Sequence, residues 1–456
     1  MKKINRLFAL CLAMLMCICL VIATSCGDNN GDNEDPISSN VDYGNADYEV
    51  YDMGGDTIHV LGFYSIVATS ETSSSEEGIL KIARRKEIEE LYNCKFKMEV
   101  ISGQEQVCQQ VKASHLAGDV RADVFCSFAG GVLSLGYQGL LYPASDVIDF
   151  SRPQWNQNVR EAGTINGKVF MFVNEPNNIE NLVTFKPQYL DTYGIENPYD
   201  LIKEGKWTTD KYLEICQKIT QLGASSGVYG GTKVDYDPGL SLVLALFGTY
   251  WVGKDADGYY YSNLDDGKII EALNWLQKVN QTAPPADKGD AVSVFKYPDA
   301  NTGLSNVSKS DPNQENKYYW CDPPMSAYIT ETPNYCQAAN VRAMPMLLGD
   351  ERAKQVGTIY ARYCEPLGDT PEETARIDAD YWYSVTYNKE SADIIIDYRT
   401  RGSEMLVWQF SGGIWNNVSK PVQTAIKNGE NFASVIESIK DAWEGYLDER
   451  NQEMDI

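Results

Sequence analysis

The chain has 456 residues, a formal net charge of −25 at pH 7, and 43% hydrophobic and 11% aromatic residues. This composition indicates a globular protein, and the length predicts two domains, because single cores rarely grow beyond about 300 residues. So acidic a surface repels nucleic acid and anionic lipid headgroups, and the charge therefore excludes nucleic-acid binding.

The N-terminus has the pattern of a bacterial secretion signal. A basic start precedes an apolar run, Leu7–Ala23, which is short for a membrane span, and small residues lead up to Cys26 as in a lipobox. We expect residues 1–25 to be removed as a lipoprotein signal peptide, and Cys26 to carry diacylglycerol and palmitate on the extracellular face of the cell membrane. The polar, acidic residues 26–50 are then a flexible tether. A plain signal peptide or a transmembrane anchor is the alternative.

Seven further cysteines are scattered along the chain without any CxxC pair. This spacing argues against a disulfide framework or a metal site and favours buried, reduced thiols. The seven are Cys94, Cys108, Cys126, Cys216, Cys321, Cys336 and Cys364. A pairing of Cys321 with Cys336 stays open.

Three extended runs alternate with two helical patterns in the first part of the mature chain. Strands are predicted at Thr57–Gly62, Lys95–Val100 and Ala122–Phe128, and helices at Glu76–Asn93 and Gln104–Leu116. This order predicts a βαβαβ unit with a parallel sheet. Ligands bind such sheets beyond the carboxyl ends of the strands. The candidate ligand-binding residues at these ends are Tyr64, Ser127 and Phe128.

The stretch Gly163–Thr220 has the pattern of a chain that crosses from one domain to another. A short extended run, Leu182–Phe185, follows a turn-rich segment, and a helix is predicted to begin near Thr208. Further helices are predicted at Gly239–Tyr250 and from Asp265 onward. Polar groups of the turn-rich segment are placed to meet a ligand at the mouth of a hinge, and the candidates are Glu175 and Asn177.

The second half of the chain is less regular. Pro284–Asn316 is predicted to be a long irregular loop because it is rich in Pro, Asp, Asn and Ser. Extended segments are predicted at Pro323–Thr330, Val341–Leu347 and Asp380–Asn388, and residues 391–450 are predicted to be largely helical.

The sequence contains no recognisable catalytic or metal-binding set. Its only two histidines, His59 and His115, lie on a predicted strand and a predicted helix. P-loop, GxGxxG and HExxH patterns are absent, and Gly223–Gly227, which matches GxSxG, follows a helix rather than a strand. We therefore expect no catalytic residue, metal or cofactor, although two carboxylates would suffice for glycoside hydrolysis.

Aromatic side chains at loop ends suit a carbohydrate ligand. Sugar rings present flat C–H faces that stack on indole and phenol rings, whereas carboxylates and amides bind the hydroxyl groups. Each ring taken alone is more often part of a core than of a site. The candidate ligand-binding rings after the first crossing are Trp251, Trp320, Trp382 and Tyr383.

The most specific pattern of the chain comprises Tyr193–Ile195, Asn197–Tyr199 and Glu204–Thr208, followed by a helix. It resembles the extracellular solute-binding proteins of family 1, which are lipoprotein receptors of carbohydrate ABC importers. The resemblance extends over most of the mature chain. One departure is Lys186-Pro187, where the family has an Asn-Lys pair.

The resemblance implies an α/β fold of the two-lobed, type II periplasmic-binding-protein kind, in which each lobe is a mixed sheet flanked by helices. Lobe 1 would comprise residues 51–178 and 319–380, and lobe 2 residues 179–318 and 381–456. The lobes would close around a ligand by hinge motion. The hinge crossings are expected near 174–185, 318–323 and 381–388.

The expected function is capture of a carbohydrate, an oligosaccharide, by a lipid-anchored monomer that delivers it to the permease subunits of an ABC transporter. Two alternatives stay open, a secreted carbohydrate-active enzyme and a ligand sensor for a membrane kinase. The missing catalytic set favours the receptor. The sequence does not name the ligand.

Overall fold

The structure is a computed structural model, and its described residues all belong to one compact unit, Tyr43–Ile456. The described residues are 48–63, 73, 75–174, 181–256, 259–298, 317–331, 335–336, 340–401, 404–405 and 411–454. Most of the predicted signal and tether lies outside them. So do four candidate residues, Cys26, Tyr64, Glu175 and Asn177.

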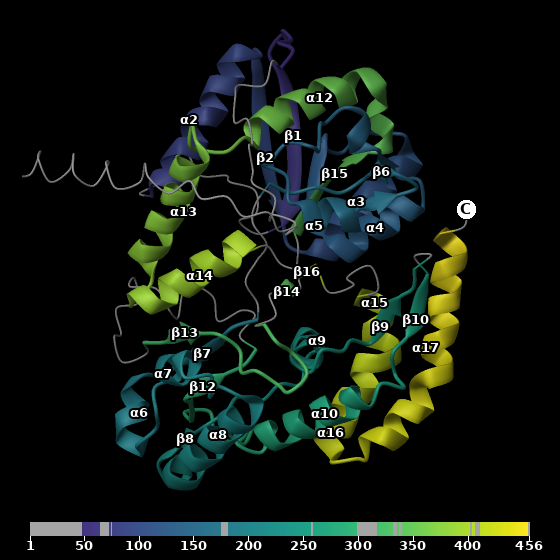
Figure 1. Ribbon diagram of the computed structural model, residues 1–456. Helices are drawn as coiled ribbons and strands as arrows, with labels where there is room; N and C mark the ends of the chain where they lie inside the picture. The colour runs from purple at the N-terminus through teal and green to yellow at the C-terminus, as the bar shows by residue number, and fades with distance from the viewer. Residues whose placement is uncertain are drawn as a thin grey trace, which may run out of the picture. The chain divides into compact units, whose positions relative to one another are not determined.

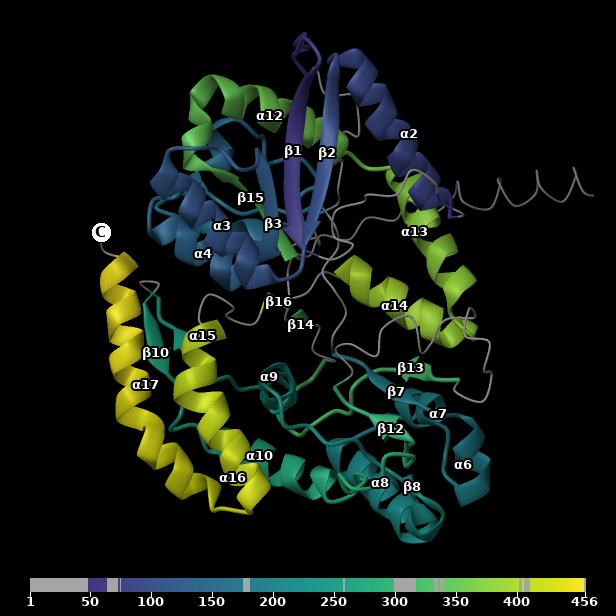
Figure 2. The same ribbon diagram turned by 180° about the vertical axis from the view of Figure 1, so that it is seen from behind.

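A five-stranded sheet forms the framework of the first body of the molecule (Figures 1 and 2). Its strands are β1 (Asp56–Phe63), β2 (Cys94–Ile101), β3 (Val124–Phe128), β4 (Leu141–Tyr142) and β15 (Asn340–Pro345), in the order β2-β1-β3-β15-β4. β1 is parallel to β2 and β3, which confirms the predicted parallel unit, and β15 runs antiparallel to β3 and β4. The sheet is therefore mixed, and its fourth strand comes from a distant part of the chain.

Two hydrophobic clusters cover the two faces of this sheet, because successive side chains of a strand point in opposite directions. In β1, Ile58 and Val60 belong to one cluster, whereas Leu61 and Phe63 belong to the other. The first cluster also includes residues of α2 (Glu76–Leu91) and α12 (Gly349–Tyr363), and the second includes residues of α3 (Gln104–Ala117) and α4 (Ala129–Tyr137). The smaller elements are η2 (Ala144–Asp146), α5 (Gln157–Ala162), β5 (Thr164–Ile165), β6 (Lys168–Val169) and η5 (Met346–Leu348).

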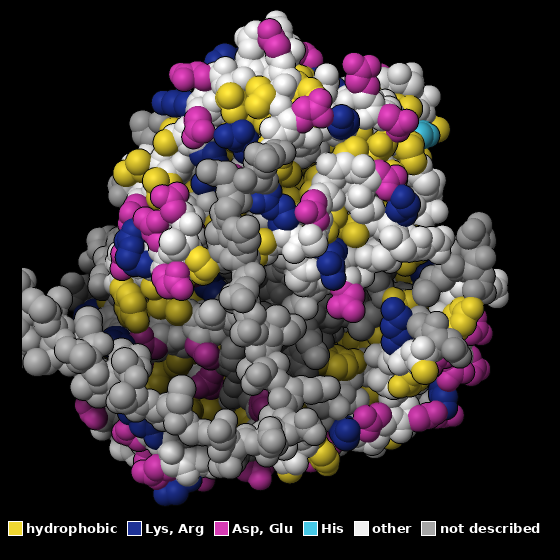
Figure 3. Space-filling view, turned by 45° about the horizontal axis from the view of Figure 1, so that its top comes forward, with side chains coloured by type: hydrophobic (Ala, Val, Ile, Leu, Met, Phe, Trp, Pro, Cys, Tyr) yellow, Lys and Arg dark blue, Asp and Glu magenta, His cyan; other side chains and the backbone are white. Residues whose placement is uncertain are grey.

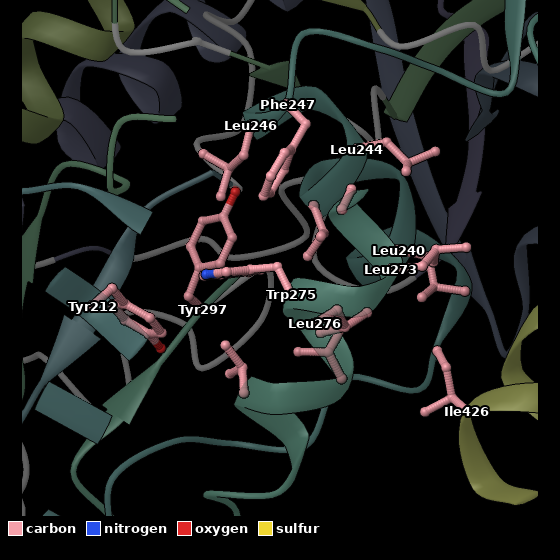
Figure 4. Close-up of a cluster of buried hydrophobic side chains, with 14 of the residues drawn as sticks. Tyr212, Leu240, Leu244, Leu246, Phe247, Leu273, Trp275, Leu276, Tyr297 and Ile426 are labelled. Carbon is pink, nitrogen blue, oxygen red and sulfur yellow. The ribbon is translucent and has the colours of Figure 1, made fainter. Parts of the chain in front are cut away.

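The second body has a separate hydrophobic core, which is mostly helical. Figure 4 shows part of it, with Trp275 and Tyr297 next to each other and leucines of two helices around them. Thr208 caps one of these helices by accepting a hydrogen bond from the Lys211 N–H at 3.2 Å, as its position in the sequence predicts. The helices are α6 (Gln188–Tyr193), α7 (Pro198–Lys203), α8 (Thr209–Gly223), η3 (Ala224–Ser226), α9 (Asp237–Leu246), α10 (Gly267–Asn280), α15 (Ser411–Ile414), a π-helix (Trp415–Ser419), α16 (Lys420–Asn428) and α17 (Phe432–Met454).

The strands of this part form small sheets. β7 (Val183–Phe185) lies between β12 (Phe295–Lys296) and β13 (Tyr319–Cys321), and both neighbours run antiparallel to it. The predicted extended run at Leu182–Phe185 is thus confirmed. The remaining pairs are β8 (Val228–Tyr229) with β11 (Val292–Ser293), β9 (Val252–Lys254) with β10 (Tyr260–Ser262), and β14 (Tyr335–Cys336) with β16 (Glu404–Met405).

The prediction of an extended segment at Asp380–Asn388 is wrong for most of its length. Residues Pro371–Val385 form helix α13, and its last turn includes Trp382 and Tyr383. Aromatic residues favour strands only weakly, whereas the start Thr370-Pro371 caps a helix: the Thr370 hydroxyl accepts a hydrogen bond from the Glu373 N–H at 3.1 Å. Pro323–Thr330 is not a strand either, because among the described residues it makes only a bridge between Met325 and Thr208.

A small fourth cluster joins segments that are far apart in the sequence. Its buried members are Leu182 before β7, Trp382 of α13 and three residues of α14 (Lys389–Arg401), and Trp320 of β13 packs against it. We call this group the hinge cluster. It brings together one residue from each of the three regions where the sequence predicts a crossing.

Candidate functional site

The carboxyl ends of the parallel strands form one edge of the five-stranded sheet. Phe63 at the end of β1 pairs with Ile101 at the end of β2, and β3 ends at Phe128. β15 begins at the same edge, because it is antiparallel and pairs Asn340 with Phe128. The Asn340 side-chain oxygen is buried and has no hydrogen-bond partner among the described residues.

Two helices start at this edge and leave their first N–H groups without a side-chain cap. α3 is preceded by Gly103 and α4 by Phe128, and neither residue makes a side-chain capping bond. The free N–H groups of a first turn can bind hydroxyl or anionic oxygens of a ligand. The edge therefore offers main-chain donors next to an amide acceptor.

Ser127 and Phe128 have different roles at the end of β3. The Ser127 hydroxyl is fully buried, donates to the Gln104 carbonyl at 2.9 Å and lies 3.4 Å from the Cys108 sulfur, which donates to it. It thus holds the start of α3 against β3. The Phe128 ring is half-buried and lies over Gly131, where a Cβ atom would be only 2.8 Å from the ring.

Trp251 lies in the core of the second body. Its side chain is 1% exposed, and its carbonyl accepts a hydrogen bond from the Trp443 indole at 3.0 Å. Its own indole N–H has no partner among the described residues. This position is that of a packing residue.

Trp320, Trp382 and Tyr383 lie at or next to the hinge cluster. The rings of Trp320 and Trp382 are 6.2 Å apart, and the Arg399 guanidinium lies 5.3 Å from the Trp382 ring centroid. Since Trp382 is 8% exposed, its ring is already covered by protein. Tyr383 points elsewhere: it is 40% exposed, and its hydroxyl donates to the Asp393 carboxylate at 2.5 Å.

Trp415 is an aromatic residue that the sequence did not single out for a site. It is 40% exposed and begins the π-helix Trp415–Ser419, next to two asparagines. π-helical turns occur often at functional sites, and an exposed indole beside amides suits a sugar face. Gly413, two residues before Trp415, has no room for a side chain, because a Cβ there would meet the Tyr446 ring at 2.1 Å.

The histidines are far from this edge and form no catalytic set. The His59 Nε2–H donates a hydrogen bond to the Glu99 carboxylate at 3.0 Å, inside a charged network with Lys97 and Arg121. This network lies midway along β1 and β2, and a cavity lined by Asp123 and Arg352 lies near the amino ends of the strands. Among the described residues there is no group of acidic, histidine and cysteine side chains that could hold a metal ion.

Other properties of the surface and thiols agree with the sequence. Acidic and basic side chains are interspersed on the face in Figure 3. Six of the seven cysteines are buried thiols that form no disulfide among the described residues, whereas the Cys336 side chain lies outside those residues. In the described parts of the chain, no helix has the length and apolar character needed to cross a bilayer.

Comparisons with known proteins identify the fold. No family model matches the chain, and no curated protein does. Among solved structures, a cyclic α-maltosyl-1,6-maltose binding protein from Arthrobacter globiformis matches 86% of this chain and 99% of its own, with 12% identity and a TM-score of 0.62.

Two further matches are of the same kind. An ABC substrate-binding protein from Listeria monocytogenes, in complex with cycloalternan, covers 86% of this chain and 99% of its own, with 15% identity and a TM-score of 0.58. A solute-binding protein of an ABC transporter from Agrobacterium vitis, with bound D-mannitol, covers 87% and 99%, with 13% identity and a TM-score of 0.56. The chain therefore has the two-lobed, periplasmic-binding-protein-like α/β fold of ABC transporter solute-binding proteins.

Proposed function

We propose that this protein is an extracellular receptor that binds a carbohydrate between its lobes and delivers it to an ABC permease. The observation that carries the proposal is the near-complete match of its fold to proteins whose solved complexes contain cycloalternan or D-mannitol. The names of these proteins describe binding and no catalysis, and the described residues of the candidate edge contain no acid–base pair. The receptor is thus proposed to be a non-enzyme.

The proposed site is the carboxyl edge of the five-stranded sheet. Phe128 supplies a half-buried ring, Asn340 an amide oxygen, and the first turns of α3 and α4 supply N–H donors. A sugar needs this combination, because its rings stack while its hydroxyls both donate and accept hydrogen bonds. Trp415 is proposed as a second stacking ring. Tyr64, Glu175 and Asn177 remain proposed contacts from outside the described residues.

The other candidate residues have different roles in this proposal. Trp320, Trp382 and Tyr383 are proposed to act at the hinge, and Ser127 to hold α3 in place. Trp251 is retained only as a support for the second body. The lobe boundaries are proposed as residues 51–178 with 319–380 and 179–318 with 381–456. β13 is the exception, because it pairs with β7 of the second body.

The mature protein is proposed to be a monomer that is lipid-anchored through Cys26. Support comes from the lipobox-like sequence and from the solute-binding fold. Labelling of growing cells with a fatty-acid analogue should mark the wild-type chain. A Cys26→Ala variant should remain unlabelled, and labelling of that variant would exclude the anchor.

Binding is tested by thermal shift and calorimetry with maltose, cycloalternan and D-mannitol as probes. We expect at least one oligosaccharide to raise the melting temperature, and Phe128→Ala or Trp415→Ala to weaken its binding by roughly tenfold, the scale of a lost anchor residue. Tyr261→Ala is the matched control, because that ring is 50% exposed but lies on β10, outside the proposed site. Equal loss in all three variants would contradict the proposed site.

Two other functions are separated by the same samples. Release of product from an oligosaccharide, followed by chromatography, would favour a carbohydrate-active enzyme. Sugar binding together with a membrane kinase gene next to the receptor gene would favour a sensor. Neither alternative has a supporting contact in the described residues.

A further inference from the structure

The main chain of Trp320 is held by a closed ring of side-chain hydrogen bonds. The Trp320 N–H donates to the Ser391 hydroxyl oxygen at 2.9 Å, and the Tyr199 hydroxyl donates to the Trp320 carbonyl at 2.8 Å. The two hydroxyl oxygens are 3.1 Å apart. Since the Tyr199 proton is used on the carbonyl, Ser391 donates to Tyr199, and each donor is used once. We call these three residues and the hydrogen bonds that join them the Trp320 hydrogen-bond ring.

The Trp320 hydrogen-bond ring takes the place of a neighbouring strand at the free edge of β13. β13 is at the edge of its small sheet, with β7 on one side only. In an antiparallel strand the N–H and C=O of one residue point to the same side. Both polar groups of Trp320 therefore point away from β7, and Tyr199 and Ser391 satisfy them where a neighbouring strand would do so.

The two hydroxyl groups of the Trp320 hydrogen-bond ring are buried, whereas Trp320 itself is half-buried. Ser391 is fully buried and Tyr199 is 9% exposed. The Tyr199 hydroxyl takes part in a third hydrogen bond, because its oxygen accepts from the Asn388 side-chain nitrogen at 3.0 Å. Burial raises the pKa of Tyr199, so its hydroxyl remains a donor at physiological pH. Every donor of the three ring residues has an acceptor, and a buried network satisfied in this way is stiff, because any displacement leaves a polar atom without a partner. The side-chain oxygen of Asn388, beside the ring, has no partner among the described residues.

The ring ties the core of the second body to α14, and α14 leads through α13 to the first body. Tyr199 packs edge-on against Phe185 at 5.5 Å, within the core of the second body. Ser391 belongs to the first turn of α14, which packs on β13 and on α13. α13 in turn packs on α2 of the first body, where Arg376 and Glu76 form an ion pair at 3.0 Å.

We propose that Tyr199 and Ser391 are positioning residues of the hinge: they fix the Trp320 peptide, hold its indole against Trp382, and so set how freely the two bodies move. They act without touching a ligand. The inference rests on the proposed receptor function, but its main test needs no ligand.

The test measures distances between the bodies by electron–electron resonance of spin labels, in a chain that lacks its signal peptide and Cys26 and carries Cys336→Ser, so that neither of these thiols takes up a label. Labels are placed at Lys86→Cys on α2 and Lys278→Cys on α10, which are exposed, whereas the six described native thiols are buried. We expect Tyr199→Phe and Ser391→Ala to broaden the ligand-free distance distribution. Ser391→Thr, which keeps the hydroxyl, should restore the parental width.

Ser326→Ala is the matched control for loss of a buried hydroxyl. Ser326 is 7% exposed, donates to the Leu246 carbonyl at 2.6 Å and accepts from the Tyr328 N–H at 3.1 Å, so it uses its hydroxyl as Ser391 does. We expect Ser326→Ala to lower the melting temperature without changing the distances. The proposal is overturned if the Tyr199 and Ser391 variants keep the parental distribution, or if Ser326→Ala broadens it equally.

A second measurement links the ring to binding. With maltose or cycloalternan as the probe, Tyr199→Phe and Ser391→Ala are expected to weaken affinity by about threefold to tenfold, the scale of one lost hydrogen bond. The double variant should lose less than the product of the two single effects, because both break one ring. If neither probe binds the parent, the receptor proposal fails, while the ligand-free distances still decide the role of the ring.

Discussion

Gly230 lies where one added methyl group would collide with main chain. A Cβ atom at this position would be 2.0 Å from the Cys216 carbonyl oxygen, and backbone of a packed helix cannot move aside. We expect Gly230→Ala to lower the free energy of unfolding by about 3 kcal/mol, as overpacking does. Urea denaturation measures the loss. Gly289→Ala is the control, since no atom lies within 4 Å of its Cβ position, and an equal loss there would contradict the explanation.

His59 links stability to pH through its position in β1. Burial lowers its pKa from the ordinary value of 6.5, and the charge of Lys97 lowers it further, although Glu99 opposes both. The unfolded chain therefore takes up this proton first as the pH falls. The contribution is fully present above about pH 6.5 and is lost as the pH falls from there to the lower pKa of the folded state.

A His59→Gln variant isolates this effect. We expect the wild-type protein to lose more unfolding free energy between pH 7.5 and 5.5 than the variant does, measured by urea denaturation at each pH. Glu99 affects stability at lower pH. The hydrogen bond from Arg121 lowers the pKa of the Glu99 carboxyl from 4.5 to about 2, so the contribution of Glu99 to stability is lost between these pH values. Equal losses in wild type and variant between pH 7.5 and 5.5 would exclude a role for His59.

Helix α13 shows how a terminal signal can outweigh local strand preference. Its sequence near Trp382 is rich in aromatic residues, yet the Thr370 cap, Pro371 and two acids of the first turn all favour a helix start. The helix places Trp382 inside the hinge cluster and Tyr383 on the outside. A strand would also separate them, but it would not pack on α2 as α13 does.

Removing the cap of α13 tests its contribution. We expect Thr370→Ala to cost about 1 kcal/mol, because the Glu373 N–H loses its acceptor, whereas Thr370→Ser should cost little. Thermal denaturation of both variants measures the difference. Two variants with the same melting temperature would show that the cap adds nothing at this exposed position.

At the scale of the whole molecule, the rate at which the thiols react with a reagent shows whether the protein is folded. All six described cysteines are buried, and burial raises the pKa of Cys216 to about 12. The reactive thiolate is thus scarce in the folded protein. In the chain without its signal peptide and Cys26, we expect a thiol reagent to modify at most Cys336 rapidly, and the other six only after unfolding in urea. Rapid reaction of two or more thiols under native conditions would contradict the packing.

Local patterns determined much of the fold. The alternation in β1 and β2, the helical spacing in α2 and α3, and the cap at Thr208 are each set within a few residues, and the structure confirms them. The parallel unit follows, because a strand, helix and strand in sequence can pair in few ways. The place of Phe128 at the carboxyl edge was therefore predictable.

Only the tertiary structure decided which side chains are covered. From the sequence, Trp251, Trp382 and Tyr383 were equivalent aromatic candidates for the site. Their exposed fractions are 1%, 8% and 40%, because partners such as Trp443 and Arg399 come from segments far along the chain. Asn340 reaches the site only through the antiparallel pairing of β15. The Trp320 hydrogen-bond ring likewise joins residues 199, 320 and 391. Such contacts depend on pairings between distant segments, which periodicity and caps do not encode.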